Sequence, residues 1–410
     1  MRYFTIPTIS LGFLSAISAS TFIYLYHFDI HWPWLQTLLG LVTLAAWLRL
    51  SPKAMFWSGF FTGIFWFWWI GLSFRYYDLG WMIPFIVLAI GLVYGIIFRL
   101  VAVLPHPALR AIPLGFMEFL HPFGFDWFRP ALMFTGSIFG DHLWQFWLFL
   151  AILTILLSMR HAARFLAIFL LIFAFHRPSA IGHRPDLDLL KQQIQIIQTN
   201  IDQNKKWQPR YRNAIIQLNI QAIKLAIGQG RKAVVLPESA FPLYLNRDIE
   251  LTQKLLDLSR EITIVTGALY AEGDKPYNST YLFRHGQLRV MHKVVLVPFG
   301  EAVPLPSWLG GWINDLFFHG ASDYITAAEP SDFEMAGCIW RNAICYEATS
   351  DILFKDDPHH MVAISNNAWF LPSTEPTLQR LLMQLQADRH GTTIFHATNG
   401  PGTGVITPNW

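Results

Sequence analysis

Long apolar runs fill the first 175 residues of the chain, with polar residues between them. A helix needs ~20 apolar residues to cross a bilayer, and most of these runs approach that length, although the fifth is short and contains Pro113 and Pro122. The runs are Ile9–Tyr26, Trp34–Leu48, Ala54–Phe74, Trp81–Phe98, Ala111–Phe123, Leu143–Met159 and Ala163–Phe175. This pattern predicts a bundle of about seven membrane-spanning helices over residues 1–176.

Composition supports two domains of different character. Hydrophobic residues make up 53% of the chain and charged residues only 14%, which is typical of membrane proteins. Charged residues are sparse up to His176 and frequent from Arg177 onward. We therefore expect a membrane domain at 1–176, a polar linker at 177–190 and a water-soluble domain at 191–410. The net charge of +3 and the scattered basic residues argue against nucleic-acid binding.

Basic residues on the connections between runs predict the orientation in the membrane. Alternate connections carry most of them: Arg2, then Arg49 with Lys53, Arg99 with Arg110, and Arg160 with Arg164. The positive-inside rule then puts the N-terminus in the cytoplasm and everything after Phe175 outside. The first run could instead be a cleaved signal peptide, since Met1 and Arg2 precede an apolar stretch that ends in small residues.

From residue 191 the pattern changes to short apolar runs that alternate with helical segments. The expected strands are Gln193–Gln198, Ala233–Leu236, Ile262–Leu269, Ser279–Phe283, Leu288–His292, Ala336–Ile344, Met361–Ser365 and Thr393–His396. The expected helices are Pro209–Ile227, Asp248–Arg260 and Glu375–His390. This alternation predicts a layered α/β domain with a mixed sheet.

Three residues that can do acyl-transfer chemistry stand at the ends of predicted strands. Glu238, Lys293 and Cys345 each follow an apolar run, and strand ends of open α/β sheets are where ligands tend to bind. A nearby carboxylate can take the proton of a thiol, and an ammonium can stabilise the thiolate and then an oxyanion. Each has a structural alternative, because Glu238 could cap a helix and Lys293 could be a solvated strand end.

The second cysteine, Cys338, lies inside an apolar strand and is read as a small core residue. A disulfide between Cys338 and Cys345 is the alternative that an oxidising compartment would allow.

The motifs PES, HK followed by VPFGE, and CYE, in this order, resemble the Glu-Lys-Cys set of the nitrilase superfamily. With the membrane half, and with QTNIDQNKKW, PYNSTYLF and SNNAWF as supporting stretches, the chain resembles the membrane-embedded branch, the apolipoprotein N-acyltransferases. The resemblance implies an α-β-β-α sandwich domain above the helical bundle, on the periplasmic side of a bacterial inner membrane. Val294-Val295 and Asn367 depart from the residues common in that family.

The resemblance also implies roles for individual residues. Glu238 would be the general base, Lys293 the oxyanion stabiliser and Cys345 the nucleophile. Cys345 would form a thioester with an acyl chain from a phospholipid, and the α-amine of the diacylglyceryl-cysteine of a lipoprotein would then attack it in a ping-pong reaction. Supporting positions are Glu301, Tyr346, Glu347, Trp207 and Asn278. Glu301 could instead be a turn residue and Trp207 a core anchor.

The implied partners are a phospholipid acyl donor, a diacylated lipoprotein acceptor and the bilayer, and we expect a monomer. No cofactor and no metal are expected, because the 15 histidines lack paired ligand spacing and no phosphate-binding glycine loop is present.

An apolar segment, Val303–Gly320, is unusual for a water-soluble domain. We read it as a mobile arm in the membrane interface that guards access to the thiol, with a plain packed subdomain as the alternative.

Two other functions compete with the acyltransferase. A membrane-tethered nitrilase-like amidase would use the same triad with water as the acceptor. A binding module with a vestigial site would have no use for an intact Glu238, Lys293 and Cys345.

Overall fold

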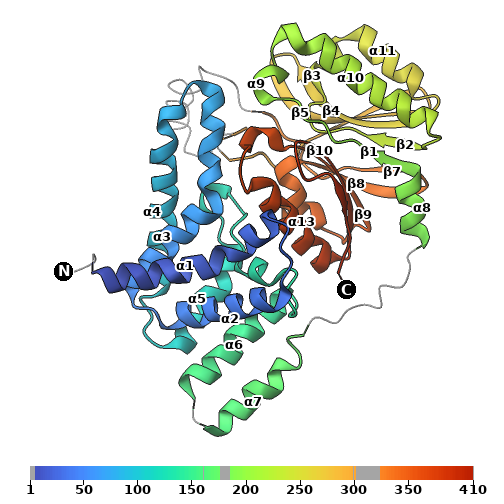
Figure 1. The fold of residues 1–410 in the computed structure, drawn as a ribbon. Helices are drawn as coiled ribbons and strands as arrows, with labels where there is room; N and C mark the ends of the chain where they lie inside the picture. The colour runs from blue at the N-terminus through green and yellow to red at the C-terminus, as the bar shows by residue number, and fades with distance from the viewer. Residues whose placement is uncertain (1–4, 160, 176–184, 299, 302–323, 410) are drawn as a thin grey trace.

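The computed structural model describes residues 5–159, 161–175, 185–298, 300–301 and 324–409. The chain forms a helical half and an α/β half, as Figure 1 shows. The predicted arm at Val303–Gly320 lies outside the described residues.

Each of the seven apolar runs overlaps a helix. These are α1 (Ile6–His27), α2 (Pro33–Arg49), α3 (Pro52–Phe67), α4 (Ile83–Val101), α5 (Pro107–Phe116), α6 (Leu143–Ser158) and α7 (His161–Leu171). Among the described residues, three helical stretches are long and apolar enough to cross a membrane: Ile6–His27, Pro52–Tyr77 and Gly80–Val101. The number of spans, about seven, therefore stays a prediction.

The helices α3 and α4 approach each other through glycines on both sides. Gly59 of α3 faces the backbone of Tyr94, and a Cβ there would lie 2.4 Å from the Tyr94 oxygen. Gly91 and Gly95 of α4 in turn face the rings of Phe60 and Phe56 on α3. Small residues four apart let two helices pack closely in a membrane, where packing rather than hydrophobicity drives association.

The α/β half contains two sheets. The first has the order β1 (Ile194–Ile196), β2 (Ala233–Val235), β4 (Thr263–Glu272), β5 (Lys275–Arg284) and β6 (Gln287–His292), with β3 (Phe241–Tyr244) also paired to β4. The second has the order β11 (Gly404–Ile406), β10 (Thr393–Asn399), β9 (His360–Asn366), β8 (Cys338–Ile344) and β7 (Asp332–Met335). The helices are α8 (Pro185–Gln193), α9 (Gln203–Lys206), α10 (Pro209–Gly228), α11 (Ile249–Leu258) and α13 (Glu375–His390).

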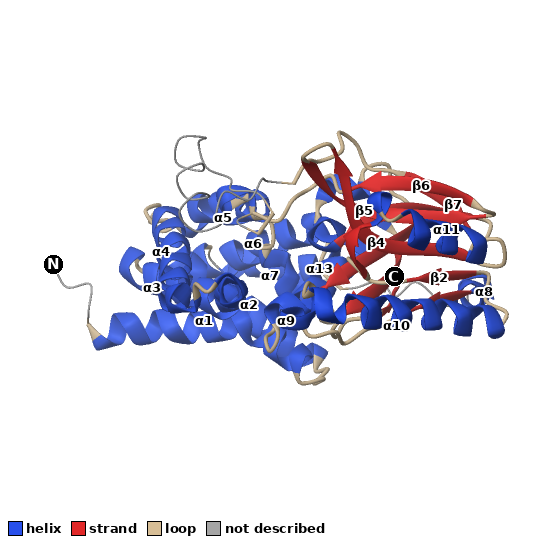
Figure 2. Ribbon diagram, turned by 90° about the horizontal axis from the view of Figure 1, so that it is seen from above, coloured by secondary structure: helices blue, strands red, loops and turns tan. Residues whose placement is uncertain are grey.

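Alternating side chains divide these elements into four layers. Val235 of β2 packs with Val362 of β9 in the core between the two sheets. Its neighbour Val234 points the other way, onto Ile223 of α10. On the far side of the second sheet, Met361 packs with Met383 of α13. The predicted α-β-β-α sandwich is confirmed, and Figure 2 shows both sheets at one end of the molecule and the helical half at the other.

Three short strands were not predicted: β3, β7 and β11. The predicted strand at Ala336–Ile344 starts too early, because Ala336 and Gly337 have φ of 51° and 79°. Two consecutive positive φ angles form the tight turn of a hairpin, and here they join β7 to β8. The last part of the expected linker is helical, in α8.

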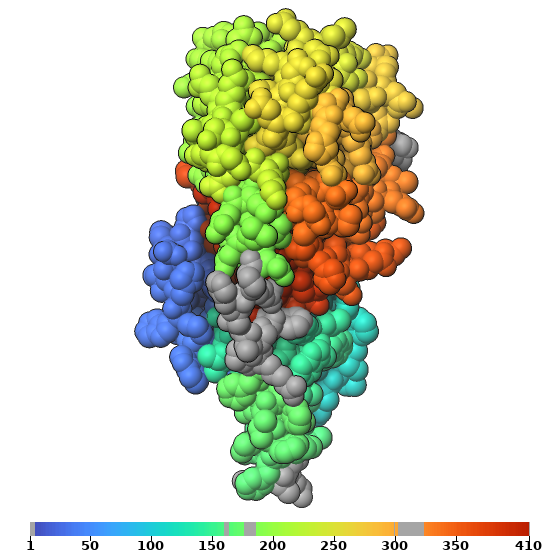
Figure 3. All heavy atoms as spheres, turned by 90° about the vertical axis from the view of Figure 1, so that its right-hand side faces the viewer, coloured from blue at the N-terminus to red at the C-terminus, as the bar shows by residue number. Residues whose placement is uncertain are grey.

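The helix α13 lies between the two halves. Met383 and Ala387 face the second sheet, whereas Leu382 and Leu385 join the core of the helical half. Across this boundary, Arg389 pairs with Glu118 at 3.0 Å. Figure 3 shows the atoms of the α/β half, coloured light green to red along the chain, above those of the helical half.

Because α3 and α4 pack through glycines, we expect that adding one methyl group at this contact will destabilise the protein. Gly59→Ala places its Cβ against the Tyr94 backbone, which cannot move aside easily, so the two helices must separate. Overpacking of this kind costs about 1–3 kcal/mol, and we expect a lower melting temperature in detergent micelles by fluorescence. Gly80→Ala is the control, because nothing lies within 4 Å of a Cβ at that position. Equal melting temperatures for the two variants would contradict the close helix contact.

Candidate active site

The first sheet brings three of the predicted site residues to one edge. Glu238 follows β2 by three residues, and Lys293 comes directly after β6. β2 is parallel to β4, and two antiparallel pairings through β5 make β6 parallel to β4 as well. The ends of β2 and β6 therefore share an edge with the start of β5, where Asn278 lies.

A glycine allows the turn that carries Glu238 to sit against β4. A Cβ at Gly267 would lie 2.5 Å from the Ser239 nitrogen and 2.6 Å from the Glu238 Cα. Ser239 itself has φ of 48°, a left-handed conformation that a residue with a side chain adopts only when its surroundings hold it there. The backbone at Glu238 is thus fixed by its neighbours in the sheet.

Asn278 joins the two carboxylates of the site. Its Nδ2 donates to Glu238 Oε1 at 2.7 Å and to Glu301 Oε1 at 2.9 Å. Glu301 Oε2 accepts from Lys293 Nζ at 2.6 Å and from the Val297 backbone nitrogen at 2.9 Å. Burial disfavours the Lys293 ammonium, but the charges of Glu301 and Glu238 outweigh burial and raise the pKa of Lys293. Lys293 is therefore a fully buried cation at neutral pH.

Cys345 comes from the second sheet, directly after β8. Its φ is 57°, so the chain turns sharply there into the 3₁₀ turn η7 (Cys345–Thr349). Burial and the Glu238 charge raise the pKa of the Cys345 thiol well above its ordinary value, while Lys293 lowers it. The resting group is therefore a thiol that needs a base when it attacks.

The disulfide alternative is wrong, because both cysteines are free. Cys338 and Cys345 lie at opposite ends of β8, which separates them by about 20 Å, far beyond disulfide reach. Cys338 packs at the margin of the core between the sheets.

The carboxylate of Glu347 connects the two sheets at the site. Its Oε1 accepts from the Ile344 nitrogen at 2.8 Å, next to Cys345. Its Oε2 accepts from the Val294 and Val295 nitrogens at 2.7 and 3.0 Å, just after Lys293. Burial raises the pKa of Glu347 to about 7, against the lowering effects of Lys293 and the three backbone donors.

Tyr346 anchors the nucleophile turn to the helical half. Its ring stacks on Phe125 and Trp127, with both pairs of ring centroids 5.8 Å apart. Its hydroxyl accepts from the Asp126 nitrogen at 2.9 Å and donates to the Gly124 oxygen at 3.2 Å. Cys345 is thus one residue away from a direct contact between the two halves.

Two residues near the thiol were missed in the sequence. Lys206 is buried and donates from Nζ to the Glu238 carbonyl at 3.0 Å, and burial lowers its pKa to about 8 although Glu238 and Cys345 raise it. Gln379 of α13 places Nε2 4.0 Å from Cys345 Sγ. The signal for Lys206 was present, since it belongs to the QTNIDQNKKW motif. The predicted Trp207 follows it and is 38% exposed.

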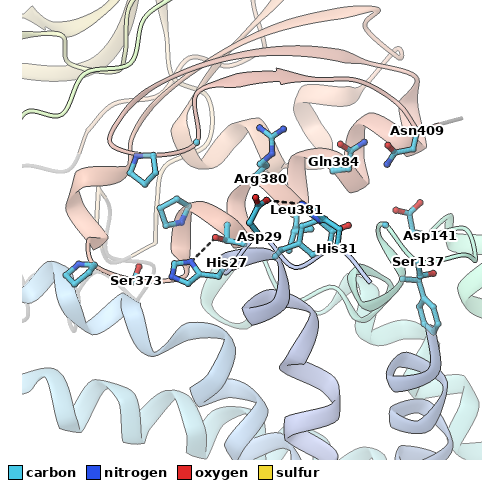
Figure 4. A pocket seen from close by; sticks show the side chains of 18 of the residues that line it. His27, Asp29, His31, Ser137, Asp141, Ser373, Arg380, Leu381, Gln384 and Asn409 are labelled. Atoms are coloured by element: carbon cyan, nitrogen blue, oxygen red, sulfur yellow. Dashed lines mark hydrogen bonds and ion pairs between the residues drawn. The ribbon is translucent and has the colours of Figure 1, made fainter. Parts of the chain in front are cut away.

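A separate cavity of about 750 Å³ lies on another side of α13. Figure 4 shows most of its lining residues, among them His27 of α1 and Arg380 of α13. His27 Nδ1 and Thr377 Oγ1 lie 3.1 Å apart and share a hydrogen bond. None of the predicted site residues lines this cavity. In the ranges that the structure describes, no group of three or more His, Cys, Asp or Glu side chains is placed to hold a metal ion.

Comparisons with known proteins agree with the predicted resemblance. A family model for the apolipoprotein N-acyltransferase integral membrane domain matches residues 6–177. The chain is 44% identical over 403 residues to apolipoprotein N-acyltransferase of Wolinella succinogenes, covering 98% of this chain and 96% of that one. It is 36% identical over 380 residues to the enzyme of Helicobacter pylori, covering 92% and 88%. A solved CN-hydrolase superfamily protein from Xanthomonas campestris is similar at 14% identity and a TM-score of 0.38, over 50% of this chain and 74% of that chain. The identity over nearly the whole length shows that this chain belongs to the apolipoprotein N-acyltransferase family.

Proposed function

We propose that the chain moves an acyl chain from a phospholipid to the α-amine of a lipoprotein's N-terminal diacylglyceryl-cysteine, through a thioester on Cys345. The observation that carries this is the cluster of a thiol, a carboxylate and a buried ammonium held directly against the apolar helical half. The names of the relatives support the same reaction.

In the first half-reaction, Glu238 takes the proton of Cys345 as the sulfur attacks the ester carbonyl carbon of the phospholipid. Lys293 stabilises the oxygen that becomes negative. The ester C–O bond then breaks, and Glu238 returns the proton to the leaving glycerol oxygen. The products are a lysophospholipid and an acyl thioester on Cys345.

In the second half-reaction, the α-amine of the acceptor attacks the thioester carbonyl carbon. Glu238 takes a proton from the nitrogen and gives it to the departing Cys345 sulfur, so the free thiol returns. Glu301 and Asn278 keep the two charged groups of the first sheet in place during both steps. They are positioning residues in this scheme.

The contact between the halves favours a lipid donor over the small amide of the hydrolase alternative. Tyr346 belongs to the core of the helical half, and Trp127 of that half donates to Thr349 at 2.8 Å in the same turn that carries Cys345. We infer that a thiol fixed at this junction can reach an ester at the membrane surface. A hydrolase of soluble amides has no need of this placement.

We also propose that the α/β half lies on the outer, periplasmic side. Arg75 donates to the Leu371 oxygen at 2.7 Å and Arg129 pairs with Asp351 at 3.0 Å, so these two arginines contact the α/β half. Arg49 instead donates to the Leu157 backbone oxygen, and Arg110 donates to the Leu50 backbone oxygen. Both arginines therefore contact the helical half. Two of the connections richer in basic residues thus have an arginine that holds the helical half together, in agreement with the positive-inside rule.

Cys345→Ala should abolish the acyl adduct that intact mass spectrometry detects after incubation with phospholipid, because no other described group carries a thiol in the site. Cys338→Ala is the matched control and should form the adduct at the normal rate. The wild-type adduct should be discharged by a diacylated lipopeptide with a free amine. Discharge by water alone would favour the hydrolase, and no adduct with any phospholipid would favour the vestigial module.

Lys206→Met should lower kcat/KM for acyl-enzyme formation about tenfold or more, which is about 1.4 kcal/mol. The variant loses the hydrogen bond to the Glu238 carbonyl and a positive charge near the forming thiolate. Its melting temperature should not fall, since a buried ammonium is costly to desolvate. The exposed neighbour gives the control, Lys205→Met. Equal rates for the two variants would remove Lys206 from the mechanism.

Reporter fusions test the orientation. Alkaline phosphatase, which needs disulfides that form outside the cytoplasm, should be active when fused after Asn409 and inactive when fused after Lys53. Protein levels of the two fusions serve as the control. The reverse pattern would place the α/β half in the cytoplasm and overturn the proposal.

A further inference from the structure

Glu375 is a buried carboxyl group that the scheme above does not use. It is the first residue of α13 and only 1% exposed. Its Oε2 has no hydrogen-bond partner within the described part of the chain. Buried polar atoms without partners are rare in folded proteins, and at an active site such an atom is a candidate for contact with a ligand.

The helix places Glu375 on the side of the thiol. Residues four apart lie on one face of a helix, so Glu375, Gln379 and Met383 form a row along α13. Met383 packs on the second sheet, and Gln379 lies 4.0 Å from Cys345 Sγ through Nε2. Glu375 extends this row by one more turn. The residues beside it, Pro376 and Thr377, line the separate cavity of Figure 4, whereas Glu375 does not.

Glu375 also differs from the other carboxylates by its surroundings. Glu238 and Glu301 share Asn278, and Glu301 has Lys293 as its counter-ion. Among the described residues Glu375 has no such counter-ion, and the titratable groups whose charges act with it are Glu238, from the end of β2, and Cys345, from the end of β8. Burial and the Glu238 charge raise its pKa well above the ordinary value, which favours the neutral carboxyl form of Glu375.

Charge balance distinguishes the two substrates. The ammoniums of Lys293 and Lys206 stand against Glu238 and Glu301 in the resting site, and Glu347 is already occupied by three backbone N–H donors. The ester carbonyl of a phospholipid adds no charge, but an α-amine arrives largely as an ammonium, because its ordinary pKa is about 7.7–8.0. A buried site needs one more negative charge to receive it.

We propose that Glu375 binds the α-ammonium of the acceptor and takes the proton that this nitrogen must lose before it attacks the Cys345 thioester. This inference rests on the proposed function and adds an acceptor-binding residue to it. As the ammonium arrives, Glu375 releases its own proton to water and becomes a carboxylate.

The protons then balance. The first passes from the ammonium nitrogen to Glu375, leaving a free amine with its electron pair. The nitrogen attacks the carbonyl carbon, the C–N bond forms and the C–S bond breaks. The second proton passes through Glu238 to the Cys345 sulfur, and Glu375 later releases the first to water.

The test uses the full-length protein in lipid nanodiscs and measures the two half-reactions separately by intact mass spectrometry. Glu375→Gln should form the acyl-enzyme within about twofold of the wild-type rate. Discharge by a diacylated lipopeptide at pH 6.5 should be about tenfold slower or more. The difference should shrink toward pH 9, where solvent deprotonates the amine. Glu250→Gln, at an exposed position of α11, is the matched control.

Hydroxylamine separates this role from a structural one, because it is a small nucleophile that is uncharged at neutral pH. Glu375→Gln should be discharged by hydroxylamine at the wild-type rate. Equal slowing with hydroxylamine and lipopeptide, slowing of acyl-enzyme formation, or normal discharge by the lipopeptide at pH 6.5 would each overturn the proposal. A wild-type protein that forms no acyl-enzyme would instead overturn the proposed function, and this inference with it.

If Glu375→Gln does not fold, the pH dependence of the wild-type protein still tests the role of Glu375. With Glu375 taking the proton, lipopeptide discharge should fall only slightly between pH 7.5 and 6.5. A fall of about sevenfold over that unit would mean that only amine already neutral in solution reacts, and would exclude the role of Glu375.

Discussion

One buried carboxylate, that of Glu347, fixes the relation between the two sheets at the site. It accepts hydrogen bonds from the backbone on both sides of the sandwich, beside Cys345 and after Lys293. Burying a carboxylate is costly, and three backbone donors offset part of that cost here. The nucleophile and the ammonium come from different sheets, so their separation depends on this side chain.

The three residues of the CYE motif serve three different surroundings. Cys345 has a φ of 57° and the 3₁₀ turn that follows has three residues per turn, so the three successive side chains point in different directions. Cys345 faces the site, Tyr346 stacks on Phe125 and Trp127 of the helical half, and Glu347 enters the junction of the sheets. The proposed nucleophile and the residue that packs the α/β half against the helical half therefore lie in the same turn of the chain.

Much of this arrangement could be predicted from the sequence, because Glu238, Lys293 and Cys345 follow clear apolar runs and the long helices have clear patterns. The three missed strands, β3, β7 and β11, have only three or four residues each, too few for a periodic pattern. Lys206 and Glu375 were missed for another reason. Both stand in polar stretches, and only the tertiary structure buries them. The apolar pair Val294-Val295 departs from the family, yet Glu347 contacts only its backbone nitrogens, so the change of side chain leaves the contact intact.

Two of the missed residues, Lys206 and Glu375, share a physical property that bears on how one site can serve two substrates. Lys206 and Glu375 are both ionisable groups whose charged forms are disfavoured by burial. Such groups change charge readily when a neighbour changes, which fixed ion pairs such as Lys293 with Glu301 do not. A reaction that first handles a neutral ester and then a cationic amine needs both kinds of group. The fixed pair holds the geometry through both steps, and the adjustable groups let the net charge of a buried site follow its substrate.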